Sequence, residues 1–380
     1  MINPVFEKNL ELVHSGMKCL NDKPLTCMTG TAFGAVLDGM TVAQFIADPV
    51  EGGKAAIRTI KRLEEEAGPI HSFNFAPNAM NMAVSITFSW NSRVLIPGID
   101  IPDDSVWQVK EQQLIDRDAY DEIMATGYNE FIQTQIFPRI IDQEYLAKYM
   151  RINAEHQPEF DAIFADWGIP VFRGAPGARV PFEPLCGMRS MLQFYKDCYK
   201  IPDKIKAVSD FVFAELTAQA EVALAAYNNP IVIGNWVGGW RTASALVNQT
   251  IFDELVWPYM KAAAEQLIRY GKIAVMHLDS EWNRDIERFG ELPQGMAILN
   301  TDAMTDLPRA RQLLPNMPLM GDVSPALLAT GSPQQVADYV KRLIDSCGPA
   351  GMFICPGCDT PINARFENMA AMLKATNEWS

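Results

Sequence analysis

The chain has 380 residues, 48% hydrophobic and 21% charged, a balance typical of a globular protein with a large core. Its formal net charge of −14 argues against nucleic acids and anionic membrane surfaces as partners, because both recruit clusters of Lys and Arg. No apolar run approaches the roughly 18 residues of a membrane span, and the acidic N-terminus does not resemble a secretion signal. Seven scattered cysteines, an odd number, indicate a reducing cytoplasm rather than a disulfide framework.

The first half of the chain mixes strand candidates with longer helical stretches. Strand candidates lie within 24–40 and within 72–90. Helical patterns occupy four stretches, namely 50–67, 116–135, 142–154 and 203–227. Residues 94–107 and 173–187 are predicted as long ordered loops. Loops of this length in a compact domain are more often functional than idle.

The second half alternates short apolar runs with amphipathic helical stretches. The strand candidates are 230–236, 272–278, 296–300, 318–323 and 351–355. Each run is rich in β-branched residues or Met and shows little alternation of apolar and polar residues, as expected of a parallel strand buried on both faces. A helix is predicted from about Ser244 to Tyr270, and four shorter ones follow the later strands.

This alternation predicts parallel βαβ units, in either a barrel or an open doubly wound sheet. No G-x-G-x-x-G or P-loop motif lies at a strand-to-helix junction, which disfavours the nucleotide-binding open sheets. We therefore predict an α/β fold, a (β/α)₈ TIM barrel, formed by a single domain over 1–380.

Polar residues follow all five late strand candidates. In chain order they are Asn235, Arg241, His277, Asp279, Asp302, Asp322 and Cys358. In a parallel barrel the carboxyl ends of the strands meet at one mouth, where such enzymes carry their catalytic residues. The pattern predicts an active site at this mouth.

His277, Asp279 and Cys358 form the most specific subset. The spacing of His277 and Asp279 lets both side chains face the same side of a strand end, and Cys358 lies in the tight turn PGCDTP. Imidazole, carboxylate and thiolate make a three-ligand Zn²⁺ site with a fourth position open for catalysis. The alternative is a hydrogen-bonded His–Asp pair beside a buried turn cysteine.

The remaining candidates each have a structural alternative. Asp302 and Asp322 are candidate catalytic residues that hold substrate or orient a ligand, but Asp also commonly caps helices. Asn235, Trp236 and Arg241 are candidate substrate-binding residues at a strand end. Four aromatic residues are candidates either for lining the substrate pocket or for packing in the core, namely Phe73, Phe75, Phe88 and Trp90.

From about Phe252 onward the sequence resembles the uroporphyrinogen decarboxylase superfamily. The resemblance rests on FDELVWPYMK, on the His277 segment, on GDVSPALLATGSPQQV and on PGCDTPINARFENMAAM, with weaker echoes in MTVAQFIADP and in the DIP of the 94–107 loop. It implies a (β/α)₈ barrel with an elaborated N-terminal region, here the helical elaboration 1–70. Dimers are common in this family, so a homodimer is expected.

Two branches of the superfamily differ in their motifs. Decarboxylases carry an Arg-rich motif near the N-terminus, where this chain has PLTCMTGTAFG without arginine. The cobalamin-dependent methyltransferases bind zinc through H-x-C and a distant cysteine in a G-C turn that precedes P and E-N. Cys358 matches that turn and His277 the motif histidine, but Asp279 stands where the motif has cysteine. Zinc accepts a carboxylate oxygen in place of a thiolate, so the resemblance implies Zn²⁺ on these three residues.

The resemblance to that branch implies methyl transfer between a small substrate and the cobalamin of a separate corrinoid protein. Aromatic residues near the predicted mouth favour a methoxylated aromatic substrate, in an O-demethylase reaction, or a thiol that accepts the methyl group. One alternative is a decarboxylase or lyase related to uroporphyrinogen decarboxylase that uses Asp302 or Asp322. The other is a non-catalytic tetrapyrrole- or corrinoid-binding protein, because fold alone does not fix function.

Overall fold

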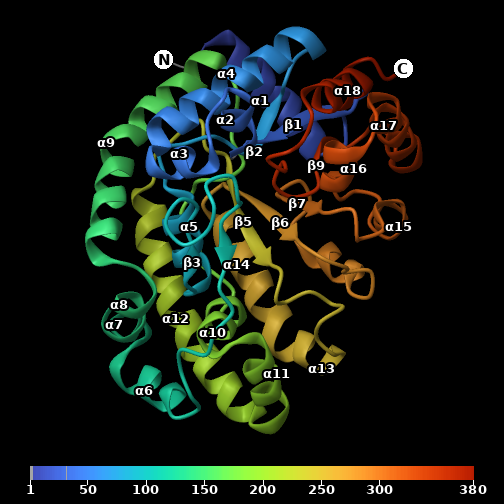
Figure 1. Ribbon diagram of the computed structural model, residues 1–380. Coiled ribbons are helices and arrows are strands. Elements are labelled where there is room, and N and C mark those ends of the chain that lie inside the picture. The colour runs from blue at the N-terminus through green and yellow to red at the C-terminus, as the bar shows by residue number, and fades with distance from the viewer. Residues whose placement is uncertain (1–2, 31) are drawn as a thin grey trace.

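The computed structural model describes residues 3–30 and 32–380. Its centre is a curled sheet of seven parallel strands surrounded by helices (Figure 1). In spatial order the strands are β2 (Ser72–Phe75), β1 (Leu25–Thr29), β9 (Met352–Pro356), β8 (Leu319–Val323), β7 (Ala297–Thr301), β6 (Ile273–Leu278) and β5 (Gly234–Gly239). Six of the seven strands are buried at every position, which explains their mainly apolar sequences, whereas β5 is partly exposed.

The two edges of this sheet are joined by a short segment around Val171. Val171 forms isolated parallel bridges with Phe73 of β2 and with Val232 just before β5. Its N–H donates to the carbonyl of Ile231 at 2.8 Å, and its carbonyl accepts from the N–H of Ile233 at 2.8 Å. The curled sheet therefore fits a TIM-like barrel with seven regular strands, and a complete eight-stranded barrel stays a prediction.

The N-terminal region contains helices and one strand of the central sheet. The helices are α1 (Pro4–Met17), α2 (Ala32–Leu37), α3 (Val42–Ala47) and α4 (Pro49–Ala67). β1 lies between β2 and β9, so residues 1–70 supply part of the sheet besides the predicted helices. Val13 and Met17 of α1 pack with Leu25 and Phe353 in the interior cluster, so α1 covers the end of the sheet where the strands begin.

The segment between β2 and β5 is mostly helical. Its elements are α5 (Met82–Trp90), the antiparallel pair β3 (Val94–Leu95) and β4 (Gln108–Val109), α6 (Ala119–Thr126), α7 (Tyr128–Phe131), the π-helical turn η1 (Ile132–Ile136), α8 (Phe137–Ile140), α9 (Gln143–Trp167), α10 (Phe182–Arg189), α11 (Met191–Lys200) and α12 (Pro202–Ala226). The predicted strand region 72–90 thus divides into β2 and α5. The predicted loop 173–187 ends in α10.

The second half follows the predicted alternation. Its helical elements are α13 (Gln249–Ile251), η2 (Phe252–Val256), α14 (Trp257–Arg269), the 3₁₀ helix η3 (Ile286–Glu291), α15 (Leu307–Leu313), α16 (Pro325–Thr330), α17 (Pro333–Cys347) and α18 (Phe366–Asn377). The helix predicted from Ser244 starts only at Gln249, because Asn248 caps its first turn. The π-helical turn η2 ends two residues before Pro258, which lacks the N–H that a regular α-helical bond requires. Within the described residues, none of the helices has the length and apolar character to span a membrane.

Candidate metal centre and substrate cavity

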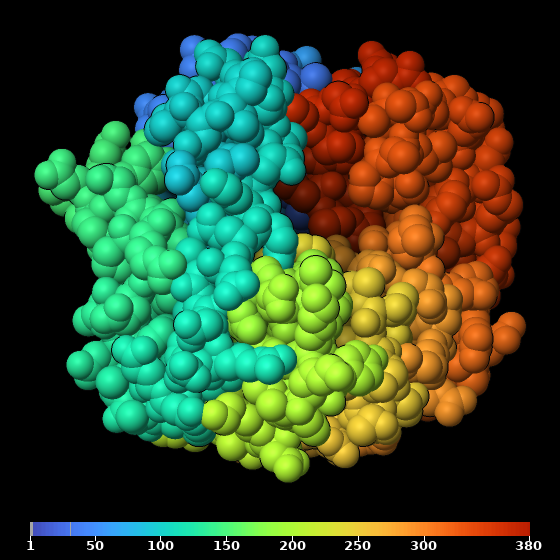
Figure 2. Space-filling model, turned by 60° about the horizontal axis from the view of Figure 1, so that its bottom comes forward, coloured from blue at the N-terminus to red at the C-terminus, as the bar shows by residue number. Residues whose placement is uncertain are grey.

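A cavity of about 830 Å³ opens where the strands of the sheet end. Figure 2 shows the hollow on this face, between the cyan part of the chain and the red C-terminal part. Its volume lies in the range of small-molecule sites, and its wall is mainly apolar, as such sites usually are. Of the strand-end residues predicted from sequence, five line it, namely Asn235, Trp236, His277, Asp279 and Cys358.

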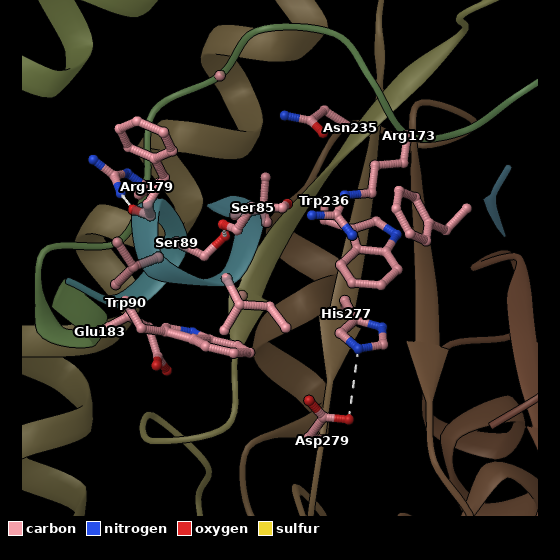
Figure 3. A pocket seen from close by; sticks show the side chains of 18 of the residues that line it. Ser85, Ser89, Trp90, Arg173, Arg179, Glu183, Asn235, Trp236, His277 and Asp279 are labelled. Carbon is pink, nitrogen blue, oxygen red and sulfur yellow. Dashed lines mark hydrogen bonds and ion pairs between the residues drawn. The ribbon is translucent and has the colours of Figure 1, made fainter. Parts of the chain in front are cut away.

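His277, Asp279 and Cys358 converge in this cavity. His277 is the fifth residue of β6 and is buried, whereas Asp279 follows the strand and is half-buried (Figure 3). Cys358, also half-buried, lies in the turn after β9, three strands away in the sheet. One ligand atom from each residue lies within 4.8 Å of the other two, and His277 Nε2 is 3.5 Å from Asp279 Oδ1.

The donor set and its spacing fit a zinc ion. With bonds of about 2.0–2.3 Å, the ligand atoms of a tetrahedral Zn²⁺ lie roughly 3.3–3.8 Å apart. The His277–Asp279 distance falls in this range, and the Cys358 ligand atom lies within 4.8 Å of the other two. One nitrogen, one oxygen and one sulfur leave a fourth position facing the cavity, the arrangement of a catalytic zinc site.

A hydrogen-bond network fixes which nitrogen of His277 faces the cluster. Asn300 donates through Nδ2 to the carbonyl of Met320 at 3.2 Å, so its Oδ1 is the atom directed at His277. That oxygen lies 2.5 Å from His277 Nδ1 and also accepts from Asn74 Nδ2 at 3.0 Å. Asn74 is held in turn by Trp236 Nε1, which donates to its Oδ1 at 2.6 Å. Because Nδ1 must carry the proton, Nε2 presents its lone pair to the cluster.

The three candidate ligands shift one another's pKa values. Burial lowers the pKa of His277, but the Asp279 carboxylate and the Cys358 sulfur raise it more, to well above its ordinary value. Burial raises the pKa of Asp279, yet His277 brings it below the usual range. Burial raises the pKa of the Cys358 thiol, and its hydrogen bond with His277 offsets part of this. A metal ion that binds here must displace protons from His277 and Cys358.

We predict that Asn300→Ala weakens zinc binding about 10- to 100-fold, as loss of an outer partner of a ligating histidine usually does. The variant removes the acceptor at His277 Nδ1, so the imidazole loses its fixed orientation. Competition with a chromophoric chelator measures the affinity. Asn300→Asp keeps an acceptor oxygen and is the matched control, which should retain most of it. Unchanged affinity in Asn300→Ala would show that Asn300 does not position the ligand.

Aromatic side chains line the apolar part of the cavity. Trp236 stacks on His277 with ring centres 3.9 Å apart and planes inclined by 8°. Phe75, Phe88 and Trp90 also line the cavity, as one interpretation of the sequence predicted. Phe73, for which core packing was the alternative, is fully buried in the main core.

Gly238 explains how β5 approaches His277 so closely. It has a positive φ of 131°, and a Cβ atom there would lie 2.4 Å from the carbonyl oxygen of His277. Only glycine permits both this backbone conformation and this spacing. The Gly238–Gly239 pair therefore lets Trp236, two residues earlier on the same strand, stack on the imidazole.

Arg241 lies behind the cavity wall rather than in it. Arg241 is fully buried, and its guanidinium packs 4.4 Å from the ring centre of Trp240. It is not one of the described residues that line the cavity. Its nearest carboxylates, those of Glu183 and Glu111, are 3.8 Å away. Glu183 does line the cavity; burial raises its pKa to about 7 and Arg241 limits the rise. Arg241 thus acts on the cavity through Glu183, and direct binding of substrate stays a prediction.

Asp302 and Asp322 bind neighbouring groups of the protein. Asp302 accepts the N–H of Ser280 at 2.8 Å and the N–H of Met304 at 2.9 Å, so it holds the loops after β6 and β7. Asp322 accepts from the hydroxyl of Tyr339 on α17 at 2.6 Å. Among the described residues, neither carboxylate lines the cavity, because these loop and helix contacts engage them. Their predicted catalytic roles remain untested.

The buried Asp322 carboxyl predicts a pH-dependent contribution to stability. Burial raises its pKa from 3.8 to about 6, although the Tyr339 hydroxyl limits the rise. The folded chain thus holds this proton more tightly than the unfolded chain. The contribution of the Asp322 carboxyl to the free energy of unfolding is fully present below pH 4. It is lost as the pH rises through 6, by about 3 kcal/mol in all. Relative to Asp322→Asn, the wild type should therefore lose this free energy of unfolding between pH 4 and 7, measured by urea titration. A constant difference across that range would contradict the buried, protonated carboxyl.

Comparisons with known proteins place the chain in a family. The model of the uroporphyrinogen decarboxylase (URO-D) family matches residues 177–379, more than half of the 380 residues. The chain belongs to the uroporphyrinogen decarboxylase family. The match spans α10 to α18 and so includes all three candidate metal ligands. It confirms the resemblance read from the sequence at the level of the superfamily.

Solved structures support the same fold. A methyltransferase from Methanosarcina mazei superposes with a TM-score of 0.65 and 14% sequence identity, covering 98% of each chain. The homocysteine methyltransferase MmuM from Escherichia coli, in its metallated form, reaches a TM-score of 0.28 with 16% identity, covering 66% of this chain and 93% of the other. That second similarity is too slight to support an argument, and the first shows a shared fold. No curated protein matches the sequence.

Proposed function

We propose that this URO-D family member is a zinc-assisted, corrinoid-dependent methyltransferase. It would move a methyl group between a small substrate, a methoxylated aromatic or a thiol, and the cobalamin of a partner corrinoid protein. The observation that carries the proposal is the convergence of His277, Asp279 and Cys358 at the wall of an open, mainly apolar cavity. These are the positions at which the methyltransferase branch of the resembling superfamily places its zinc ligands, with carboxylate in place of one thiolate.

The residues of the chain prepare the cavity for this chemistry. His277 offers Nε2 because Asn300 holds its other nitrogen, and Asp279 and Cys358 supply two negative ligands. A bound Zn²⁺ would supply a Lewis acid for the substrate's heteroatom at the open position. The apolar wall, including Trp236 and Phe88, excludes water and packs against an aromatic ring. In the O-demethylase direction, the ether oxygen would keep the electron pair of the broken bond and leave as a phenolate.

The cobalamin is proposed to arrive on a separate protein at the mouth of the cavity. The cavity opens at the carboxyl ends of the strands, whereas α1 covers the opposite end, so a carrier would approach from the open face (Figure 2). All seven cysteines are free thiols, and a Cys358 thiolate needs reducing surroundings such as the cytoplasm. A single 380-residue domain and a homodimer remain parts of this proposal.

Metal analysis combined with a cobalamin assay tests the proposal. Protein purified without chelator should contain about one zinc per chain by elemental analysis. Added cob(I)alamin with a methoxyarene, or methylcobalamin with a thiol, should then show the absorbance change of methyl transfer. Protein stripped with a chelator should lose this activity and regain it with zinc. Absence of methyl transfer with all of these substrates, in zinc-loaded protein, would overturn the proposal.

The family match favours a second candidate, a decarboxylase or lyase acting on a tetrapyrrole. The β1 region, where the sequence comparison places the Arg-rich motif of decarboxylases, contains no arginine in LTCMT. Spectrophotometric assay with uroporphyrinogen separates the two candidates directly. A non-catalytic tetrapyrrole- or corrinoid-binding protein would bind such ligands with an affinity that His277→Ala and Cys358→Ala leave unchanged.

A further inference from the structure

Arg173 is a cavity residue that the sequence analysis did not single out. It follows the Val171 segment that bridges the two edges of the sheet, at the same end as the metal-ligand candidates. Figure 3 shows Trp236 between Arg173 and His277, so the arginine and the imidazole lie on opposite sides of one indole. Arg173 is therefore close to the candidate metal centre without touching it.

Two aromatic rings lie against the Arg173 guanidinium. Its Cζ lies 4.3 Å from the ring centre of Phe75 and 4.2 Å from that of Trp236. Among the described residues, no oxygen atom accepts a hydrogen bond from it. Burial lowers its pKa to about 10, and the charge of Asp359 offsets part of this effect, so the side chain is still a cation at neutral pH.

This arrangement leaves a half-buried cation whose donors are open to acceptors from the cavity. Aromatic rings stabilise a guanidinium cation, but they do not supply the oxygen acceptors that its five N–H donors require. Arg173 lines the cavity, so an acceptor bound there would complete its hydrogen bonding in partly dehydrated surroundings. The planar fork of donors matches the two oxygens of a carboxylate.

The other two arginines near the cavity are placed differently. Arg179 also lines it, but its Nη1 donates to the carbonyl of Phe88 in a short hydrogen bond. Arg241 faces Glu183 and Glu111 behind the wall. Of these three, Arg173 is the one that both lines the cavity and makes no hydrogen bond within the described part of the chain.

We propose that the substrate carries an acidic group, a carboxylate or an equivalent oxyanion such as a sulfonate, and that Arg173 binds it inside the cavity. The inference deepens the proposed function and rests on it, because it names the substrate as a methoxylated aromatic acid. The acid group binds to Arg173 on one side of Trp236. The ether lies on the other side, toward His277, Asp279 and Cys358, and the aromatic ring between them packs against the apolar wall.

Calorimetric titration with matched ligands tests this assignment. The probes are 4-methoxybenzoate, its neutral isostere 4-methoxybenzamide, and 4-methoxybenzenesulfonate, which separates a carboxylate from a sulfonate preference. Wild type should bind at least one acid about 10- to 100-fold more tightly than the amide, as expected for a charged two-point hydrogen bond. Arg173→Gln should abolish that preference and leave amide binding unchanged.

Two further variants keep the result interpretable. Arg309→Gln removes an exposed arginine on α15 and should bind every probe as the wild type does. Arg173→Lys keeps the charge but not the planar fork, so it should retain a reduced preference for the acid even if Arg173→Gln folds poorly. Equal binding of acids and amide by the wild type, no binding of either acid, or a full preference in a folded Arg173→Gln would each overturn the proposal.

The outcome separates this inference from the proposed function, since the titrations involve no methyl transfer. If acids bind through Arg173 but no methoxylated acid is demethylated, the anion site stands and the methyltransferase function fails. If neutral methyl ethers are demethylated as fast as acids and Arg173→Gln has no effect, the function stands and the anion site fails.

Discussion

Cys358→Ala is expected to remove the metal and with it the methyl transfer activity. Structural zinc sites in zinc-finger peptides bind with apparent free energies of roughly 10–16 kcal/mol, or about 2.5–4 kcal/mol for each of four ligands, so loss of one thiolate should weaken binding about 100- to 1000-fold. The remaining His277 and Asp279, 3.5 Å apart, offer only one nitrogen and one carboxylate. Elemental analysis after gel filtration should show zinc falling from about one per chain to a small fraction.

The matched control for this variant is Cys19→Ala. Cys19 is half-buried like Cys358, and burial raises the pKa of its thiol too, but it lies near Arg311 and does not line the cavity. Cys19→Ala should keep both zinc and activity. One zinc per chain in Cys358→Ala, in a protein with an unchanged circular dichroism spectrum, would place the metal elsewhere in the molecule.

The late strands could be predicted from sequence because a parallel strand buried on both faces has a continuous apolar sequence. β6 to β9 lie within one residue of the predicted runs. β5 differs, since the predicted run 230–236 was expected to be the strand but the regular strand is the Gly-rich 234–239. Ile231 and Ile233 instead bond to Val171, a pairing that joins distant parts of the chain and that no local pattern reveals.

The first half was harder to predict because its apolar stretches do not show whether they form strand or helix. In 72–90, β2 has four residues and the helix α5 begins at Met82, after Asn81 caps it. Short apolar runs without clear periodicity allow both structures. The N-cap asparagine was the local signal that divides this stretch.

The site could be predicted only as far as strand ends place backbone positions. Position at the carboxyl end of a barrel strand does bring His277, Asp279 and Cys358 together. It does not give side-chain direction, so Asp322 contacts Tyr339 and Arg241 packs behind the wall. Asp302 and Asp322 do not cap the following helices, because Asp306 precedes α15 and Ser324 precedes α16.

The supporting residues of the site were missed for a related reason. Asn300 and Asn74 act through hydrogen bonds across 226 positions of sequence, which no spacing rule detects. Arg173 lies in a loop that was predicted to be functional, but its importance depends on the two aromatic rings that pack against it. Loop length was thus the one signal in the sequence that pointed to it.

Substitution of Asp279 is expected to show whether this carboxylate is a metal ligand or only the hydrogen-bonded partner of His277. If Asp279 is a ligand, Asp279→Ala and the isosteric Asp279→Asn should each weaken zinc binding on the order of 100-fold, because each removes a negatively charged donor. Asp279→Cys should instead bind zinc at least as tightly and reject Mn²⁺ more strongly, since thiolate is the softer ligand. Chelator competition with both metals measures these affinities. If Asp279→Ala keeps wild-type zinc affinity while Cys358→Ala loses it, the carboxylate acts on His277 alone and the third ligand comes from another group.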